Sequence, residues 1–222
     1  SVMGKVQILL RQHVGAPCAP CVEVGADVKK GTLIATPTGL GANIYASVYG
    51  KVTEITDDRI IIEAADEQPD EFVPIDVPED ASKLDMVKAA GVVGMGGAGF
   101  PTGVKLNINL AETPMGEINP EINPELPKDF SIDCGYILIN AAECEPGLEH
   151  NTQQIETQTD KVIRGIKYCM EITHAEKTII AIKKKHHKAI KALQKALEKE
   201  SAITMHLLPD IYPMGEERAV VR

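Results

Sequence analysis

The sequence predicts an α/β protein in two parts, a small all-β module followed by a domain built on a parallel sheet. Short runs rich in Val, Ile and Thr, separated by Gly and Pro, fill residues 6–77 without helical periodicity. A polar linker follows at residues 76–81. Beyond it, apolar runs alternate with amphipathic stretches, a pattern typical of parallel strands joined by helices. We therefore place the two domains at residues 1–78 and 82–222.

The first part reads as short strands joined by turns. We expect strands at residues 6–10, 32–35, 48–55 and 59–63, with Asp57-Asp58 at the tip of a hairpin. Strands this close together leave no room for helical crossovers, so the module is expected to be a self-closed β-structure.

The second part begins with a short helix that Ser82 caps and Gly91 ends. Continuous apolar runs predict buried strands at residues 136–140, 177–182 and 203–208. Apolar stripes predict amphipathic helices at residues 152–171 and 186–200. We interpret the Lys and His run at residues 183–187 as the solvated start of the second helix, and the proline-rich residues 107–127 as an extended loop.

Composition excludes several classes of function. The net charge is −9 and only 4% of the residues are aromatic, with no Trp, so we expect no nucleic-acid partner. No apolar run reaches the length of a membrane span, and the N-terminus lacks a secretory segment. We therefore expect a cytoplasmic protein that can reach a membrane only through partner subunits.

The five cysteines are expected to be free thiols in such a compartment. Cys18 and Cys21 form a Cys-Ala-Pro-Cys motif within the β module. Three interpretations stay open for this pair: half of a metal site, a redox disulfide, or packing without chemistry.

The strongest chemical signal is the glycine loop, residues 91–105, which holds six glycines within thirteen positions. Such a backbone can approach a ligand closely and point N–H groups at anionic oxygens, and Lys105 adds a positive charge. No Gly-Lys-Ser/Thr segment follows, so the loop is not a P-loop. A tight turn between helix and strand is the alternative interpretation.

Residues 21–35 and 44–54 of the first part resemble the biotinyl/lipoyl type of barrel-sandwich hybrid. Gly25 and Gly31 stand at its tight turns. Carrier domains of this type attach their cofactor to a Lys at the following hairpin tip, but here residues 39–43 contain none. The resemblance therefore implies a structural or docking module rather than a carrier.

Three blocks of the second part resemble the FMN- and NADH-binding subunit of respiratory complex I and the C subunit of Rnf-type electron transport complexes. They are Gly94-Met-Gly-Gly-Ala-Gly-Phe-Pro-Thr-Gly-Val-Lys105, Tyr136-Ile-Leu-Ile-Asn-Ala-Ala-Glu-Cys-Glu-Pro-Gly147 and Tyr212-Pro-Met-Gly-Glu-Glu217. The preceding barrel-sandwich module is similar to the Rnf branch, and within it to soluble relatives associated with amino-acid reductases such as proline reductase.

The resemblance implies a Rossmann-like α/β domain that binds FMN and NADH. In this family Phe100 would stack on the dinucleotide, Glu143 would lie near the flavin and Glu145 near the nicotinamide nucleotide. Hydride transfer to flavin needs no protein acid or base, so we expect no catalytic residue and no metal ligand. The implied cofactor-binding residues are Gly94, Gly96, Gly97, Phe100, Lys105, Asn140, Glu143, Glu145, Tyr212, Gly215, Glu216 and Glu217.

The expected function is electron transfer from NADH through FMN to iron–sulfur clusters or to a partner reductase. We expect the domain to continue beyond residue 222, and any [4Fe–4S] cluster to lie in that continuation. Met95 and Ala142 replace an Arg and an Asp of the complex I subunit. These departures favour the alternative function, a scaffold subunit without cofactor.

Overall fold

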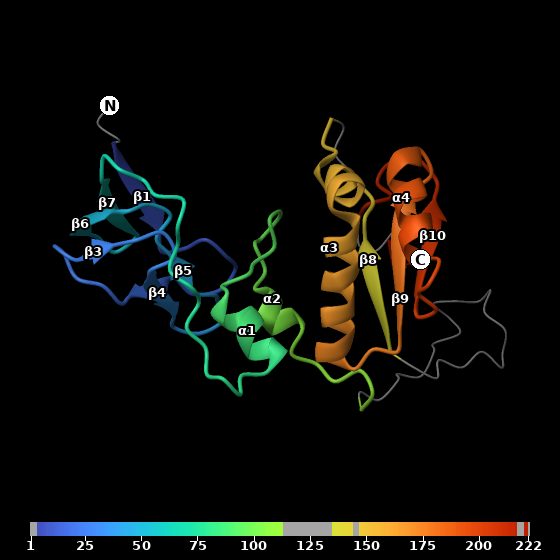
Figure 1. Cartoon of the computed structure of the whole chain (residues 1–222), viewed down its shortest axis with the longest axis horizontal. Coiled ribbons are helices and arrows are strands. Elements are labelled where there is room, and N and C mark those ends of the chain that lie inside the picture. The colour runs from blue at the N-terminus through green and yellow to red at the C-terminus, as the bar shows by residue number, and fades with distance from the viewer. Residues whose placement is uncertain (1–3, 113–134, 144–146, 217–219, 222) are drawn as a thin grey trace. The chain divides into compact units, whose positions relative to one another are not determined.

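The computed structural model describes residues 4–112, 135–143, 147–216 and 220–221 of the chain. The chain forms two compact units, residues 1–107 and 108–222 (Figure 1). Each unit has its own hydrophobic core.

The first unit contains two small antiparallel sheets, as expected for a barrel-sandwich hybrid. One sheet has the strand order β1-β7-β6-β3 and the other the order β2-β4-β5. The strands are β1 (Lys5–Leu9), β2 (Cys18–Pro20), β3 (Asp27–Val28), β4 (Leu33–Pro37), β5 (Ile44–Tyr45), β6 (Gly50–Ile55) and β7 (Arg59–Ala64).

The core of the first unit follows from the two-residue period of its strands. In β7, Ile60 and Ile62 are fully buried, whereas Ile61 and Glu63 between and after them are more exposed. The predicted hairpin of β6 and β7 is confirmed, with Asp58 in its turn. Side chains from both sheets join one apolar cluster that includes Val52 and Ile34, and this cluster holds the two sheets together.

The first unit extends past the polar linker and includes the glycine loop. Helix α1 (Lys83–Ala89) begins at Ser82, as predicted, with a capping box between Ser82 and Asp85. At its end, the carbonyl of Ala89 accepts a hydrogen bond from the Tyr45 hydroxyl of β5. Helix α2 (Thr102–Lys105) closes the loop. These contacts attach the glycine loop to the β module, and the compact unit extends to residue 107.

The second unit is a three-stranded parallel sheet with the strand order β10-β9-β8. Its elements alternate along the chain as β8 (Tyr136–Asn140), α3 (His150–Thr173), β9 (Lys177–Lys183), α4 (His187–Leu197) and β10 (Ile203–Leu208). The predicted order of strands and helices is confirmed. Helix α3 begins two residues earlier than expected and ends at His174, which has a left-handed backbone.

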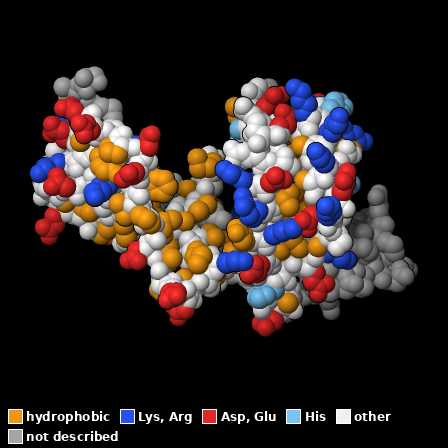
Figure 2. Space-filling model, viewed as in Figure 1, with side chains coloured by type: hydrophobic (Ala, Val, Ile, Leu, Met, Phe, Trp, Pro, Cys, Tyr) orange, Lys and Arg blue, Asp and Glu red, His pale blue; other side chains and the backbone are white. Residues whose placement is uncertain are grey.

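Both helices pack on the same face of this sheet, because α3 and α4 contact each other and share one apolar cluster with β9. Ile180 and Ile182 of β9 point into that cluster and are almost fully buried. Figure 2 shows Lys and Arg side chains gathered over α3 and α4. None of the described helices is long and apolar enough to cross a membrane.

Candidate functional site

The carboxyl ends of the three parallel strands bring two of the predicted site segments together. Asn140 is the last residue of β8, and its Nδ2 donates a hydrogen bond to the carbonyl of Gly215, 2.8 Å away. Its Oδ1 accepts from the backbone N–H of Ala142 at 3.1 Å. Parallel sheets bind ligands at the carboxyl ends of their strands. The segment after β8 and the segment after β10 therefore meet where a ligand is expected.

Glu143 caps the long helix α3 from outside the helix. Its Oε1 accepts hydrogen bonds from the backbone N–H groups of Asn151 and Thr152, at 2.5 and 3.3 Å. The N-cap residue Glu149 makes no such bond with its own side chain. A carboxylate at a helix N-terminus is favoured by both the free N–H groups and the helix dipole.

The second carboxylate oxygen of Glu143, Oε2, takes no part in these hydrogen bonds. The side chain is only 4% exposed, yet Oε2 has no hydrogen-bond partner among the described residues. His150 Nδ1 lies 4.0 Å away, which is too far for a hydrogen bond. A buried oxygen without a partner is costly, so this atom is an acceptor suited to a ligand O–H or N–H group.

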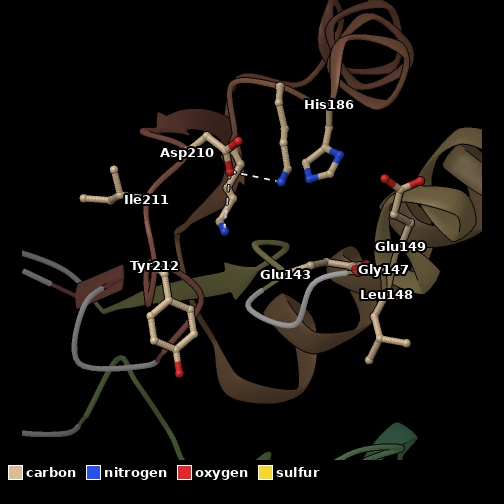
Figure 3. A pocket seen from close by; sticks show the side chains of 10 residues that line it. Glu143, Gly147, Leu148, Glu149, His186, Asp210, Ile211 and Tyr212 are labelled. Atoms are coloured by element: carbon tan, nitrogen blue, oxygen red, sulfur yellow. Dashed lines mark ion pairs between the residues drawn. The ribbon is translucent and has the colours of Figure 1, made fainter.

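Glu143 lines a pocket of about 200 Å³ at the strand ends, which we call the strand-end pocket (Figure 3). Its wall comes from the ends of β9 and β10 and from the start of α3. The lining residues are Glu143, Gly147, Leu148, Glu149, Lys183, Lys185, His186, Asp210, Ile211 and Tyr212.

Eight of the ten lining residues were not expected in a site, and four of them bring polar side chains from the ends of β9 and β10: Lys183, Lys185, His186 and Asp210. Lys183 Nζ and Lys185 Nζ lie 3.7 and 3.0 Å from the same oxygen of Asp210. The hydrogen bond from Lys185, with further attraction from Lys183 and His186, lowers the pKa of Asp210. The side chains come from the ends of two strands that are neighbours only in the folded sheet, so no local sequence spacing reveals them.

The interpretation of residues 183–187 as a solvated helix start is wrong for two of its members. Lys183 is 4% exposed and His186 is 8% exposed, whereas Lys184, Lys185 and His187 face solvent. His186 Nε2 is buried and has no hydrogen-bond partner among the described residues. Strand β9 continues one residue further than expected, to Lys183, and this residue is buried with its Nζ 3.7 Å from Asp210.

Three glycines of the predicted site, Gly94, Gly96 and Gly97, lie in the first unit. Residues 94–99, the glycine tip, line a hollow of about 400 Å³ together with Arg11, Gln12, His13 and Val14. The backbone N–H of Val14 donates to the carbonyl of Ala98 at 2.8 Å, which ties the tip to the loop after β1. Gly94, Gly96 and Gly97 thus line one hollow, and the β module supplies its other wall.

Phe100 and Lys105 form a pair beside this tip. Lys105 Nζ lies 5.9 Å from the centre of the Phe100 ring, within the range of a cation–π contact. Phe100 is 38% exposed, and neither residue lines the glycine-tip hollow.

The third block contributes two further predicted residues at the strand ends. Tyr212 is 80% exposed and lines the strand-end pocket (Figure 3). Glu216 donates its backbone N–H to the carbonyl of Pro213 in a turn. Glu145 and Glu217 lie outside the described residues.

The Cys-Ala-Pro-Cys motif has one buried and one exposed thiol. Cys18 Sγ lies 3.5 Å from His13 Nε2 and 3.2 Å from the carbonyl of Ala42, within the core of the β module. Cys21 faces solvent, and both thiols are free. Burial raises the pKa of each thiol, which disfavours the reactive thiolate. This arrangement favours the packing interpretation for Cys18.

Within the described part of the chain, no group of three or more His, Cys, Asp or Glu side chains is arranged to hold a metal ion.

Comparison with protein families divides the chain in two. Residues 87–222 match the Nuo51 FMN-binding domain, and residues 1–73 match the RnfC barrel sandwich hybrid domain. Both assignments agree with the resemblances seen in the sequence motifs.

Two individual relatives agree with these family matches, since both are C subunits of ferredoxin:NAD(+) oxidoreductase complexes. The chain is 36% identical over 98% of its length to the C subunit of the proton-translocating ferredoxin:NAD(+) oxidoreductase complex of Clostridium ljungdahlii, of which it covers 46%. It is 32% identical over 97% of its length to the Na(+)-translocating counterpart of Acetobacterium woodii, of which it covers 48%. Over 59% of the chain it is 40% identical to the cobalamin reductase PduS of Citrobacter freundii, of which it covers 23%. The chain thus spans just under half the length of the first two relatives.

Proposed function

We propose that this chain, which belongs to the family of the Nuo51 FMN-binding domain, is the flavin-binding part of an RnfC-type electron-transport subunit. In this role the chain would bind FMN and NADH, and the flavin would supply the hydride acceptor from which electrons pass on to iron–sulfur clusters or to partner Rnf subunits. The names of the Clostridium and Acetobacterium relatives support electron exchange between ferredoxin and NAD.

The names of these relatives also indicate which proteins the chain is expected to bind. Both relatives are subunits of ion-translocating complexes, and none of the relatives named above is an amino-acid reductase. We therefore propose Rnf-type subunits as the partners, with attachment to the membrane through them. We further propose that the parallel sheet of the second unit is part of a Rossmann-like fold.

The buried Oε2 of Glu143 is the observation that carries the proposal. It is an acceptor without a partner among the described residues, and it belongs to a residue that lines the pocket at the carboxyl ends of the strands, where nucleotides bind in α/β sheets. Flavin and nicotinamide nucleotides present ribityl or ribose hydroxyls and ring N–H groups, which are the donors that such an oxygen needs. We propose that Glu143 accepts one of these donors, and that its Oε1 stays on the N-terminus of α3.

The other residues orient the reactants in this proposal. The amide of Asn140 uses one donor on Gly215 and one lone pair on Ala142, so one donor and one lone pair remain for a ligand. The glycine tip offers backbone N–H groups to phosphate. Phe100 and Tyr212 are exposed aromatic rings suited to stacking. Bound FMN supplies the hydride acceptor, and these side chains hold the reacting groups in place. We also propose that Lys105, Glu145, Gly215, Glu216 and Glu217 contact the cofactors.

One observation favours the alternative of a scaffold without cofactor. Ala142 is 6% exposed and packs with Ala181, Leu208 and Met214. Where the complex I subunit has an Asp, this chain therefore has an apolar contact and offers no carboxylate to a flavin.

Flavin binding and reduction separate the two proposals. The chain is titrated into FMN and the quenching of flavin fluorescence is measured, and NADH is then added without oxygen while flavin bleaching is followed. Saturable binding and bleaching are expected, and Glu143→Ala is expected to weaken binding. Asp160→Asn, at an exposed position of α3, is the matched control. Absence of FMN binding by the wild-type chain contradicts the flavin role and favours the scaffold.

A further inference from the structure

The glycine-tip hollow of the first unit has a second wall that no flavin-domain motif contains. The wall is the loop of residues 11–14, which connects β1 to β2 of the barrel-sandwich module. This loop belongs to the RnfC barrel sandwich hybrid match, whereas the glycine tip belongs to the FMN-binding match. The two families therefore meet at one surface within one compact unit.

The loop of residues 11–14 is held rigidly. Before it, Leu10 donates its N–H to the carbonyl of Asp58 at 2.8 Å. Within it, His13 Nδ1 donates to the carbonyl of Val14, and Nε2 accepts the N–H of Ala42. Because both ring nitrogens are used in hydrogen bonds, the orientation of the buried ring is fixed.

The chain after the loop is also fixed by close packing. Gly15 has a φ of +109°, and a Cβ there would lie 2.2 Å from the carbonyl oxygen of Leu40. Gly99 of the tip has a φ of +62°, and its Cβ would lie 3.0 Å from the carbonyl oxygen of Gln12. The backbone of Arg11 is thus set in a constant position relative to the glycine tip.

The glycine tip, which lines the same hollow as this loop, has free backbone donors. The N–H groups of Met95, Gly96, Gly97 and Ala98 make no hydrogen bond to any residue that the structure describes. A Cβ added at Gly96 or Gly97 would meet nothing within 4 Å, so the approach to these donors is open. Consecutive free N–H groups around a residue with positive φ, here Gly97 at +58°, form a concave site for anions.

Arg11 gives this hollow its charge. Among its described lining residues Arg11 is the one charged side chain, and no Asp or Glu lines the hollow. The guanidinium is exposed and makes no ion pair or hydrogen bond with a described residue. Lys105, the cation expected here from the sequence, lies instead over the ring of Phe100. An arginine beside free N–H groups suits the geometry of a phosphate group.

We propose that Arg11 and the free N–H groups of the glycine tip bind a phosphate group of the nucleotide cofactor. This inference rests on the proposed function, and it adds a binding residue from the barrel-sandwich module. The phosphate is either the phosphomonoester of FMN or the diphosphate of the nicotinamide dinucleotide. The module is then part of the cofactor site and not only a docking element.

The test measures the affinity of the chain for FMN, riboflavin, NAD⁺ and inorganic pyrophosphate. FMN and riboflavin are followed by flavin fluorescence, and NAD⁺ and pyrophosphate by calorimetry. The variants are Arg11→Gln and Arg11→Lys, with Lys29→Gln as the matched control on another surface of the same unit. We expect Arg11→Gln to weaken binding of the phosphate-bearing ligand by about 10- to 100-fold. Riboflavin binding is expected to stay unchanged, Arg11→Lys to recover part of the loss, and Lys29→Gln to match the wild type.

The outcomes separate the two proposals. A loss for FMN but not for NAD⁺ assigns the flavin phosphate, and the reverse assigns the dinucleotide diphosphate. A wild-type chain that binds NAD⁺ or pyrophosphate through Arg11 but binds no FMN keeps this inference and contradicts the flavin role. Equal affinities of wild type and Arg11→Gln for every phosphate ligand, or no binding of any of them, overturn the inference.

Discussion

The glycine-tip hollow and the strand-end pocket offer polar groups to a ligand in opposite ways. The hollow is made of backbone N–H groups with one exposed cation, and its wall holds no acid among the described residues. The strand-end pocket is made of side chains, with Lys183, His186 and Glu143 buried around it. The first site depends on the backbone conformation of a loop. The second depends on side chains, of which Lys183, Lys185 and Asp210 pair with one another while Glu143 Oε2 and His186 Nε2 have no partner among the described residues. Substitutions should therefore affect the two sites differently.

The largest effect is expected from Glu143→Ala in the strand-end pocket. The change removes the carboxylate that caps two N–H groups of α3, and hydrogen bonds to charged groups contribute about 1.5–3 kcal/mol each. We expect a loss of about 3 kcal/mol in the free energy of unfolding of the second unit, since the two bonds are not additive. Urea denaturation followed by far-ultraviolet circular dichroism measures it, because α3 and α4 dominate the helical signal.

Glu143→Gln is the control, because it keeps an oxygen for the helix and removes the charge. We expect it to lose less than half as much stability as Glu143→Ala. If both variants are as stable as the wild type, Glu143 does not cap α3. The strand-end pocket would then not differ from the glycine-tip hollow in its dependence on a side chain.

His13→Ala is expected to produce the next largest effect, in the wall of the glycine-tip hollow. The substitution leaves the N–H of Ala42 without its acceptor inside the β module and removes the bond to the carbonyl of Val14. A buried donor without a partner costs about 1–3 kcal/mol, so we expect a loss of about 2 kcal/mol in the first unit. Calorimetry measures the stability, and hydrogen exchange should show faster exchange at Val14, whose N–H bonds to the glycine tip. Unchanged exchange there would show that the ring does not hold this loop.

Gly97→Ala and Gly96→Ala test whether the tip depends on backbone conformation. Gly97 has a φ of +58° and open space around its Cβ position, so alanine there brings strain and no clash. We expect a loss of about 1 kcal/mol for Gly97→Ala. Gly96 has equal space but no positive φ, so Gly96→Ala should stay within about 0.5 kcal/mol of the wild type. Equal losses in calorimetry would show that the left-handed conformation of Gly97 is not what the tip requires.

Elements with a long apolar period could be predicted from the sequence. The helices α3 and α4 were predicted because each has a repeating apolar face, and the strands β8, β9 and β10 because each is a continuous apolar run. The expectation that β8 is buried is wrong, since none of its residues is fully buried. The strands β3 and β5, of two residues each, cannot be told apart from turns. The glycines of the tip were recognised because glycine is chosen for backbone freedom, which is a local property. Arg11 was not recognised, because the whole β module separates it in sequence from the loop that it faces.

The strand-end pocket shows the same limit. Asn140 and Gly215 could be predicted from motifs, yet the hydrogen bond that joins them depends on the order of strands in the sheet. At Lys183 and at Asp210 the local sequence predicts a charged side chain that is exposed to solvent. Only the neighbouring ends of β9 and β10 bring them together. Local propensity thus predicts the elements, and topology decides which side chains meet.

The smallest effect is expected from Asp210→Asn, and it concerns pH. The two lysines lower the pKa of Asp210 in the folded protein relative to its unfolded value near 4. A lowered folded pKa adds stability that is fully present above about pH 4 and is lost as the pH falls through the folded pKa. Asp210→Asn should therefore flatten the fall in melting temperature of the second unit below about pH 4, with a shift of at most a few degrees at neutral pH because the carboxylate is exposed. Asp160→Asn, on an exposed turn of α3, should leave this slope as it is in the wild type. An unchanged acid slope in Asp210→Asn would mean that the carboxylate is not held by the lysines in solution, and that the polar wall of the strand-end pocket is as free to receive a ligand as the glycine tip.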